Sequence, residues 1–319
     1  MEKKKIGMMA RTEGLEKLIN RLPFEHQSQV YLQKELHRTA SGVRGEYRIE
    51  ARLKEFYLDE DFRVIWNVQL QLGNWPVQMD GLLLTERCAI IIESKNISGK
   101  IHFDEKTGEF FRIDDEDLKT VMEDPQIQLR KNMRFLTLWF QKHKISLPIH
   151  GLIVFTAKKC EFITKPANTM ICKTYQMPEM LLKILQASPP QASTIKLAKI
   201  KKMLQANQSP YKPVPLCKKY FIDAADLKQG VFCRFCQFYT MQRCKRSWQC
   251  QRCGERDKDA HHLAIREYFA LIDSSLTNQE FRRFCGIESP FVASRLLNQM
   301  DLEKKGELIT RTYELKNSE

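Results

Sequence analysis

The sequence predicts a mixed α/β sheet flanked by helices, followed by a small cysteine-rich module and a helical C-terminal unit. The first part rests on the order of the apolar patterns: a helix, three strands, a second helix and a further strand. The second part rests on two Cys-x-x-Cys pairs that stand 13 residues apart. The third part rests on apolar residues at helical spacing after Asp259.

The N-terminal residues have the periodicity of helices. Residues 1–40 predict one or two helices, in which Leu15, Leu18 and Leu22 share one side, and we interpret them as a packing arm. Residues 44–60 predict a further helix, because their apolar residues form a single stripe.

Strand-like runs follow this helix. The predicted strands are 62–72, 77–85, 88–95, 101–103, 110–113 and 149–156. Residues 106–108 indicate a hairpin turn between two of them, and Pro125 begins a long amphipathic helix that ends at about Lys142. This order predicts a mixed sheet with helices on its faces.

The pattern weakens after residue 165. Residues 178–185 and 194–206 are helix-like, and Ser209–Pro215 has the composition of a linker. A capped helix is predicted from Thr277, and a turn that contains glycine separates it from a second helix at Val292–Met300. Such a pair indicates a helix-turn-helix-like or winged unit, or two helices that only build the domain.

The chain therefore divides into five predicted segments. They are an N-terminal helical arm (1–40), an α/β domain (41–188), a basic helix and linker (189–229), a cysteine module (230–256) and a helical unit (257–319).

Charge and composition indicate which classes of partner this protein can bind. Residues 191–256 hold 14 Lys or Arg and three acidic residues, so most of the net charge of +13 lies there. An anionic partner, nucleic acid first, explains this excess, and a solvated surface or basic linker is the alternative. No apolar run approaches the ~20 residues of a membrane span, and no signal peptide is evident. We therefore expect a cytoplasmic protein without a membrane partner, whose ten cysteines bind metal or stay as thiols.

Two carboxylates and a lysine form the clearest chemical pattern. Asp80 lies on one predicted strand, and Glu93 and Lys95 lie on the next. Side chains two residues apart on a strand point the same way, so Glu93 and Lys95 share a face. Two carboxylates that can share a hard divalent cation, beside a lysine, are what metal-assisted phosphodiester cleavage requires.

The order of these residues and their neighbours resembles the nuclease-related domain (NERD) family, which occurs mostly in bacteria and has a restriction-endonuclease-like, PD-(D/E)xK fold. The resemblance covers about residues 41–160. The motifs that carry it are Gly45-Glu46, Asp80-Gly81, Glu93-Ser94-Lys95-Asn96, Gly99-Lys100-Ile101 and Pro125-Gln126-Ile127-Gln128.

The resemblance implies five catalytic residues: Asp80, Glu93, Lys95, Glu46 and Gln128. Asp80 and Glu93 would hold a catalytic Mg²⁺ or Mn²⁺. Lys95 would stabilise negative charge on the phosphorus, because a lysine between two carboxylates tends to stay protonated. No further acid stands beside either carboxylate, so we expect one essential metal. Asn96 and Gly99 are expected at the mouth of the pocket.

The two cysteine pairs predict a structural zinc site that resembles a zinc ribbon. The ligands would be Cys233, Cys236, Cys250 and Cys253, with Cys244 as a substitute. Four thiolates leave no open position on the ion, so this Zn²⁺ has no catalytic role. A redox pair or an iron–sulfur site fits the spacing less well. The cations and aromatic rings around the site suit phosphate contacts and base stacking, unless the rings only build the ribbon's core.

We therefore predict a Mg²⁺-dependent phosphodiesterase, a nuclease that acts on nucleic acid, with DNA favoured over RNA. The zinc ribbon would bind the nucleic acid. The alternative is a non-catalytic nucleic-acid-binding or adaptor protein with a degenerate nuclease fold. All positions matched to the family hold residues competent for catalysis, which favours the enzyme.

Overall fold

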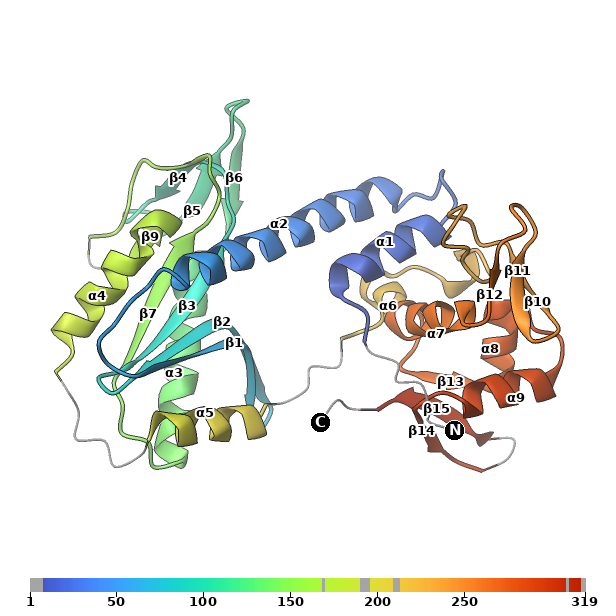
Figure 1. Cartoon of the computed structure of the whole chain (residues 1–319). Helices are drawn as coiled ribbons and strands as arrows, with labels where there is room; N and C mark the ends of the chain where they lie inside the picture. Colours follow the sequence, from blue (N-terminus) through green and yellow to red (C-terminus); the bar gives the residue numbers. More distant parts are fainter. Residues whose placement is uncertain (1–7, 168–169, 190–195, 209–212, 308–309, 317–319) are drawn as a thin grey trace. The chain divides into compact units, whose positions relative to one another are not determined.

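The chain folds into two compact units. A computed structural model describes residues 8–167, 170–189, 196–208, 213–307 and 310–316. Unit 1 contains residues 1–39 and 212–319, and unit 2 contains residues 40–211 (Figure 1). The segment predicted as an N-terminal arm is thus part of the same unit as the C-terminal residues. The predicted linker falls partly on residues 209–212, which lie outside the described ranges.

Unit 2 is built on a five-stranded mixed sheet in the order β1-β2-β3-β7-β9. Its strands are β1 (Phe62–Leu72), β2 (Trp75–Thr85), β3 (Ala89–Lys95), β7 (Ile149–Phe155) and β9 (Ile171–Lys173). The first three strands are antiparallel, whereas β3, β7 and β9 run parallel. The mixed α/β architecture confirms the predicted fold class.

Helices cover both faces of this sheet (Figure 1). They are α2 (Gln29–Leu53), α3 (Pro125–Lys142), α4 (Met177–Ala187) and α5 (Leu197–Ala206). Residues of α3 and α5 share one apolar core with the sheet, and residues of α2 and α4 share another. The central strand β3 is buried on both sides, which explains its continuous apolar run.

A smaller sheet of unit 2 has the order β6-β5-β4-β8. Its strands are β4 (Gly99–Phe103), β5 (Phe110–Ile113), β6 (Lys119–Met122) and β8 (Cys160–Phe162). The predicted hairpin between β4 and β5 is present. Strands β6 and β8 were not predicted, because their few residues include no apolar run like that of β5.

The predicted boundaries of the helix before the sheet were wrong. We expected a helix at residues 44–60, but α2 runs without a break from Gln29 to Leu53, and the boundary between the units falls within it. No proline interrupts this stretch, so the helix continues through Gly42 and Gly45. The apolar stripe extended past the helix because Phe56, which follows it, is also buried in the core.

Unit 1 combines helices with two small sheets. Its elements are α1 (Arg11–Arg21), α6 (Leu216–Tyr220), η2 (Ala224–Asp226), β10 (Met241–Cys244), β11 (Ser247–Cys250), β12 (Arg256–Asp257), α7 (Ala260–Leu271), β13 (Ser275–Thr277), α8 (Asn278–Cys285), α9 (Pro290–Asn298), β14 (Leu302–Lys305) and β15 (Thr312–Leu315). The prediction of a helical C-terminal unit was incomplete, since β13, β15 and β14 form a sheet there. No helix among the described residues has both the length and the apolar character that a membrane crossing needs.

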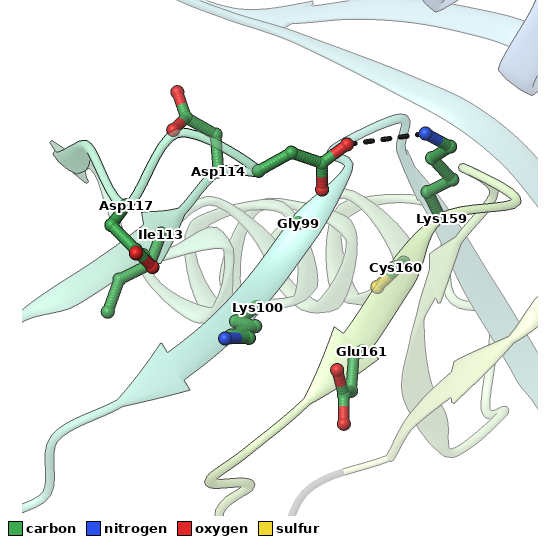
Figure 2. A pocket seen from close by; sticks show the side chains of 9 residues that line it. Gly99, Lys100, Ile113, Asp114, Asp117, Lys159, Cys160 and Glu161 are labelled. Carbon is green, nitrogen blue, oxygen red and sulfur yellow. Dashed lines mark hydrogen bonds and ion pairs between the residues drawn. The ribbon is translucent and has the colours of Figure 1, made fainter.

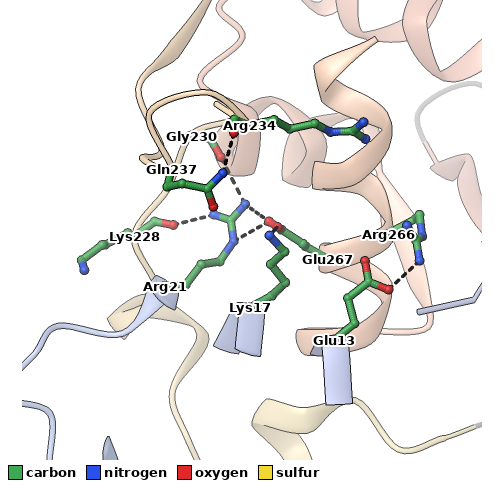
Figure 3. A network of polar contacts seen from close by, with 9 residues as sticks. All are labelled: Glu13, Lys17, Arg21, Lys228, Gly230, Arg234, Gln237, Arg266 and Glu267. Carbon is green, nitrogen blue, oxygen red and sulfur yellow. Dashed lines mark hydrogen bonds and ion pairs between the residues drawn. The ribbon is translucent and has the colours of Figure 1, made fainter. Parts of the chain in front are cut away.

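A buried ion pair ties α1 to the rest of unit 1 (Figure 3). The side chains of Arg21 and Glu267 are fully buried, and Arg21 Nε donates to Glu267 Oε2 over 2.8 Å. Arg21 also donates to the backbone carbonyls of Lys228 and Gly230. Its guanidinium therefore joins α1 to two segments that are far from it in the sequence.

We expect Arg21→Leu to lower the free energy of unfolding by about 3–5 kcal/mol, because it leaves the buried Glu267 carboxylate with only the more distant Lys17, 3.9 Å away. Adding Glu267→Met should recover much of this loss. Urea unfolding of the full chain, followed by circular dichroism, measures both effects.

The matched control for this ion pair is Glu13→Ala. It removes the half-exposed Glu13–Arg266 pair between the same two helices and should cost less than about 1 kcal/mol. Equal losses of unfolding free energy in Arg21→Leu and Glu13→Ala would show that burial does not increase the contribution of the Arg21–Glu267 pair to stability.

Candidate active site and cysteine cluster

The pairing of β2 with β3 brings the two predicted metal-binding carboxylates together. Gly81 lies opposite Ile92 in this antiparallel pair, and one further step along the same register places Asp80 opposite Glu93. The backbone N–H of Ser94 donates to Asp80 Oδ2 over 2.8 Å, which fixes the Asp80 carboxylate beside β3.

The face of β3 that carries Glu93 and Lys95 is turned toward α3. Ala89 and Ile91, which share this face, pack in the core that α3 covers. Gln128 lies in the first turn of α3, which Pro125 begins. Lys95 Nζ is 2.8 Å from both Glu93 Oε1 and Gln128 Oε1, so its ammonium group is held between the strand and the helix.

Two glycines leave room for side chains that pack tightly around this site. A Cβ on Gly45 would lie 2.6 Å from Thr156 Oγ1 and 3.1 Å from the Asn96 side chain, so α2 can lie against the end of β3 only without one. This contact brings Glu46, the next residue on α2, toward the carboxylates. A Cβ on Gly81 would meet the ring of Trp66 at 2.6 Å.

Burial and mutual repulsion perturb the three carboxyl groups. The Glu93 residue is 1% exposed. Burial, and then the neighbouring Asp80, raise the pKa of Glu93 to about 7, against the opposing charge of Lys95. Burial also raises the pKa of Asp80. Burial and then Asp80 raise the pKa of Glu46. All five residues predicted for catalysis therefore lie in one neighbourhood.

This carboxylate group has the chemistry of a divalent cation site. Glu93 Oε2 is buried and has no hydrogen-bond partner among the described residues. A hard cation such as Mg²⁺ binds one or two carboxylates. Such an ion would contact Glu93 Oε2 and would place positive charge beside Asp80 and Glu93. The residues present therefore fit such an ion.

A basic hollow of about 270 Å³ lies beside the end of β3. It is lined by Ser41, Arg44, Arg48, Asn96, Ser98, Ala157, Lys158 and Lys159. Arg48 is anchored by a 2.6 Å hydrogen bond from its Nη1 to the carbonyl of Thr156. Asn96, which we expected at the mouth of the catalytic pocket, lines this hollow. The sequence reading missed the arginines, although they stand four residues apart on the helix that carries Glu46.

A second hollow of about 480 Å³ is lined by the starts of β4 and β8 and by the turn after β5, and Gly99 is part of it (Figure 2). Gly99 has φ +98°, and a Cβ there would lie 2.5 Å from a backbone carbonyl oxygen. Asp114, Asp117 and Glu161 line this hollow together with Lys100 and Lys159. Acids and lysines are mixed here, so it lacks the excess of positive charge that suits a polyanion.

The four predicted zinc ligands form one cluster in unit 1. Sulfur atoms of Cys233, Cys236, Cys250 and Cys253 all lie within 4.8 Å of one another. The Sγ atoms of Cys233 and Cys253 are 3.7 Å apart, and those of Cys236 and Cys250 are 3.5 Å apart. Tetrahedral Zn–S bonds of about 2.3 Å place sulfurs about 3.8 Å apart, so the cluster can hold a metal such as zinc. This arrangement is consistent with a zinc ribbon.

Other cysteine, histidine and aromatic residues near the cluster have structural roles or none. Cys244, considered as a substitute ligand, is exposed and lies outside the cluster. Trp248 is buried in the core, and its Nε1 donates to His261 Nδ1 over 3.1 Å. Phe235 is 75% exposed, so it remains available for contacts outside the chain.

The fold and the site define a mixed α/β domain in which an aspartate on one strand faces a Glu-x-Lys motif on the next. Residues 41–156 match the family model of the nuclease-related domain (NERD). The chain thus contains a nuclease-related domain, as its motifs predicted, and this points to a nuclease-related function on nucleic acid. The match does not reach the cysteine cluster. No curated protein and no solved structure matches the chain.

We expect Glu93→Gln to stabilise the metal-free protein at pH 8. Folding raises the pKa of Glu93 from 4.5 to about 7, so the folded state favours the protonated carboxyl group. The stability that this group contributes is fully present below pH 4.5, and it is lost as the pH rises through 7 and the group ionises in the folded protein. The glutamine variant should therefore exceed the wild type by up to about 3 kcal/mol at pH 8, and should match it near pH 4.5. Thermal unfolding in EDTA across this range measures the difference.

Glu86→Gln, which removes an exposed acid from the turn between β2 and β3, is the control and should show no such pH dependence. If the Glu93 variant and the wild type had parallel stability curves, the Glu93 carboxylate would not be perturbed.

We expect Cys253→Ser to lose zinc and to become sensitive to protease between residues 233 and 253, because three thiolates hold the ion less tightly. Mass spectrometry of the metal in purified protein should find about one zinc per wild-type chain. Cys244→Ser should keep this zinc. A stoichiometric zinc content in the Cys253 variant would refute the ligand set.

Proposed function

We propose that the nuclease-related domain is a metal-dependent nuclease that hydrolyses phosphodiester bonds, with DNA as the favoured substrate. The observation that carries this proposal is the Glu93 carboxylate, which is buried beside Asp80 with one oxygen unpartnered and is contacted by Lys95. A domain that only binds nucleic acid gains nothing from burying two repelling carboxylates, since this arrangement lowers its stability.

The side chains of the site have separate tasks in this proposal. Asp80 and Glu93 would hold Mg²⁺ or Mn²⁺. When bound, this ion polarises the scissile phosphate and lowers the pKa of the attacking water. Lys95 donates to Glu93 and Gln128, which leaves the third N–H of its ammonium group for a phosphate oxygen as negative charge develops.

Glu46 and Gln128 support these groups from the two helices. Glu46 adds negative charge near Asp80 and could accept a hydrogen bond from the attacking water. Gln128 uses its Oε1 to hold Lys95, so its amide N–H₂ stays available to a phosphate oxygen.

The basic hollow supplies the substrate contacts that the carboxylates cannot make. Arg44, Arg48 and Lys158 surround Asn96, which follows the catalytic lysine by one residue. A nucleic-acid strand whose scissile phosphate lies at Asp80 and Glu93 would place a neighbouring phosphate here. In the C-terminal part, we propose that the four cysteines bind structural Zn²⁺ and that the surrounding cations bind nucleic acid.

We expect Glu93→Ala and Asp80→Ala each to abolish Mg²⁺-dependent cleavage, because each removes a ligand of the ion. Lys95→Ala should lower kcat by about 10²–10³-fold, which is typical for loss of one preorganised donor. Cleavage of plasmid DNA, single-stranded DNA and RNA, with Mg²⁺, with Mn²⁺ and with EDTA, measures these losses and ranks the substrates.

Asp59→Ala is the matched control, because it removes an acid from the segment before β1 and should leave cleavage unchanged. Cleavage that survives in both ligand variants would refute the site. If no variant and no wild type cleaves, while salt-dependent binding of DNA remains, the non-catalytic alternative is correct.

A further inference from the structure

The aromatic side chains of the cysteine module divide into a buried set and an exposed set. Trp248 is buried, and Phe232 is buried against the ring of Tyr239, whose centre lies 5.1 Å from its own. Phe235 and Phe238 are instead 75% and 48% exposed, and neither packs on another aromatic ring in the described part of the chain. The first three rings therefore stabilise the fold, and the other two remain available to a partner.

The two exposed rings belong to one short loop, which also holds the first cysteine pair. Phe235 lies between Cys233 and Cys236. The backbone N–H of Cys233 donates to the carbonyl oxygen of Phe238 over 2.8 Å, and Gln237, with φ +63°, reverses the chain before it. Backbone hydrogen bonds thus hold both rings beside the metal cluster.

An arginine reaches this loop from the second cysteine pair. Arg252 lies between Cys250 and Cys253, and its Cζ is 3.8 Å from the centre of the Phe238 ring. The four cysteine sulfur atoms, all within 4.8 Å of one another, keep the two loops together. A guanidinium group is planar and packs against aromatic rings and nucleic-acid bases alike. Arg252 and Phe238 therefore form one cation–π pair at the surface of the module.

The same surface carries positive charge without acidic neighbours in the sequence. Residues 233–253 contain five Lys or Arg and no Asp or Glu. Arg234, Arg246 and Arg252 are exposed, and none of the three makes an ion pair with a described residue. A partner that fits this surface must therefore be anionic and must also present flat groups to the exposed rings.

A nucleic-acid strand with unpaired bases meets both requirements. Its phosphates pair with arginines, and its bases stack on exposed aromatic rings. In a duplex, neighbouring base pairs cover the faces of each base, and only the base edges are accessible in the grooves. A ring can stack on a base of a duplex only by separating the base pairs, which costs free energy.

We propose that Phe235, Phe238 and Arg252 form a stacking surface through which the cysteine module binds single-stranded DNA. This inference rests on the nucleic-acid binding proposed above for the module and deepens it, because it states which form of the nucleic acid is bound. The exposed arginines contact phosphates, and the two rings receive unpaired bases.

The test is the fluorescence anisotropy of labelled ligands with the full chain. The ligands are an oligothymidylate of about 15 nucleotides, a duplex of the same length and an abasic strand of the same length and charge. Every protein carries Glu93→Ala, and the buffer contains neither Mg²⁺ nor a chelator, so the strand stays intact and zinc stays bound. Phe235→Ala and Phe238→Ala should each weaken binding of oligothymidylate about 10-fold, as expected for one lost stacking contact. Binding of the duplex and of the abasic strand should not change.

Arg234→Ala separates the effect of charge from the effect of stacking. Loss of this exposed cation should weaken binding of oligothymidylate and of the abasic strand alike. It should also lower the slope of log Kd against log salt by about 0.7. The two phenylalanine variants should keep the original slope, because they remove no charge.

Phe291→Ala is the matched control, since Phe291 is an 85% exposed ring on α9 of the same unit and should not change the Kd. Phe235→Trp keeps a flat ring at the proposed surface. It should bind oligothymidylate as tightly as Phe235 does, and oligothymidylate should quench the fluorescence of the added tryptophan. Zinc content should be the same in all these variants, because none of them removes a cysteine of the cluster.

An unchanged Kd for oligothymidylate when both rings are replaced by alanine overturns the inference, whereas cleavage by the protein with Glu93 intact still tests the nuclease proposal separately. Equal losses of affinity for the abasic strand or the duplex would show that the rings do not stack on unpaired bases. If Phe235→Trp bound no better than Phe235→Ala, the ring would have no role in binding. Dependence on the rings for oligouridylate but not for oligothymidylate would overturn the assignment to DNA.

Discussion

Burial of the Glu93 carboxylate is the constraint on which the nuclease-related domain depends. A carboxylate at the end of a strand buried on both faces needs partners that water would otherwise supply. The pairing of β2 with β3 brings Asp80 close, and α3 brings Gln128 to the lysine that neutralises Glu93. The glycine before Glu46 lets α2 close the remaining side. The fold thus concentrates negative charge at one edge of its sheet.

Unit 1 is stabilised in a different way, by a buried positive and a buried negative side chain that contact each other. Its segments come from both ends of the chain, and the buried guanidinium of Arg21 donates to the Glu267 carboxylate and to two backbone carbonyls. The cysteine cluster fixes a second point, where short strands alone would be marginal. The ion pair and the cysteine cluster each join distant segments through a few directional contacts. Short helices and strands bury little apolar surface, so a unit built from them needs such contacts.

The sequence predicted those helices and strands in which apolar residues repeat at a regular period, and those sites whose residues stand at a characteristic spacing. Strand β1 and helix α3 were predicted at their observed bounds, because the first alternates and the second has a proline start and an apolar stripe. The five residues proposed for the active site came from the Glu-x-Lys pattern and from the resemblance to the nuclease-related domain family, and the structure brings them together. Tertiary partners could not be predicted: nothing in the sequence links Arg21 to Glu267, since this pair depends on packing between elements far apart in the chain.

The charges at the site of unit 2 link its stability to the ion that the proposed reaction needs. Asp80 and Glu93 are both buried, burial raises the pKa of each, and Lys95 is the cation that contacts Glu93. One lysine beside two buried carboxylates leaves a cost in stability in the free protein. A metal ion bound at Asp80 and Glu93 would relieve this cost, so binding of the ion should stabilise unit 2.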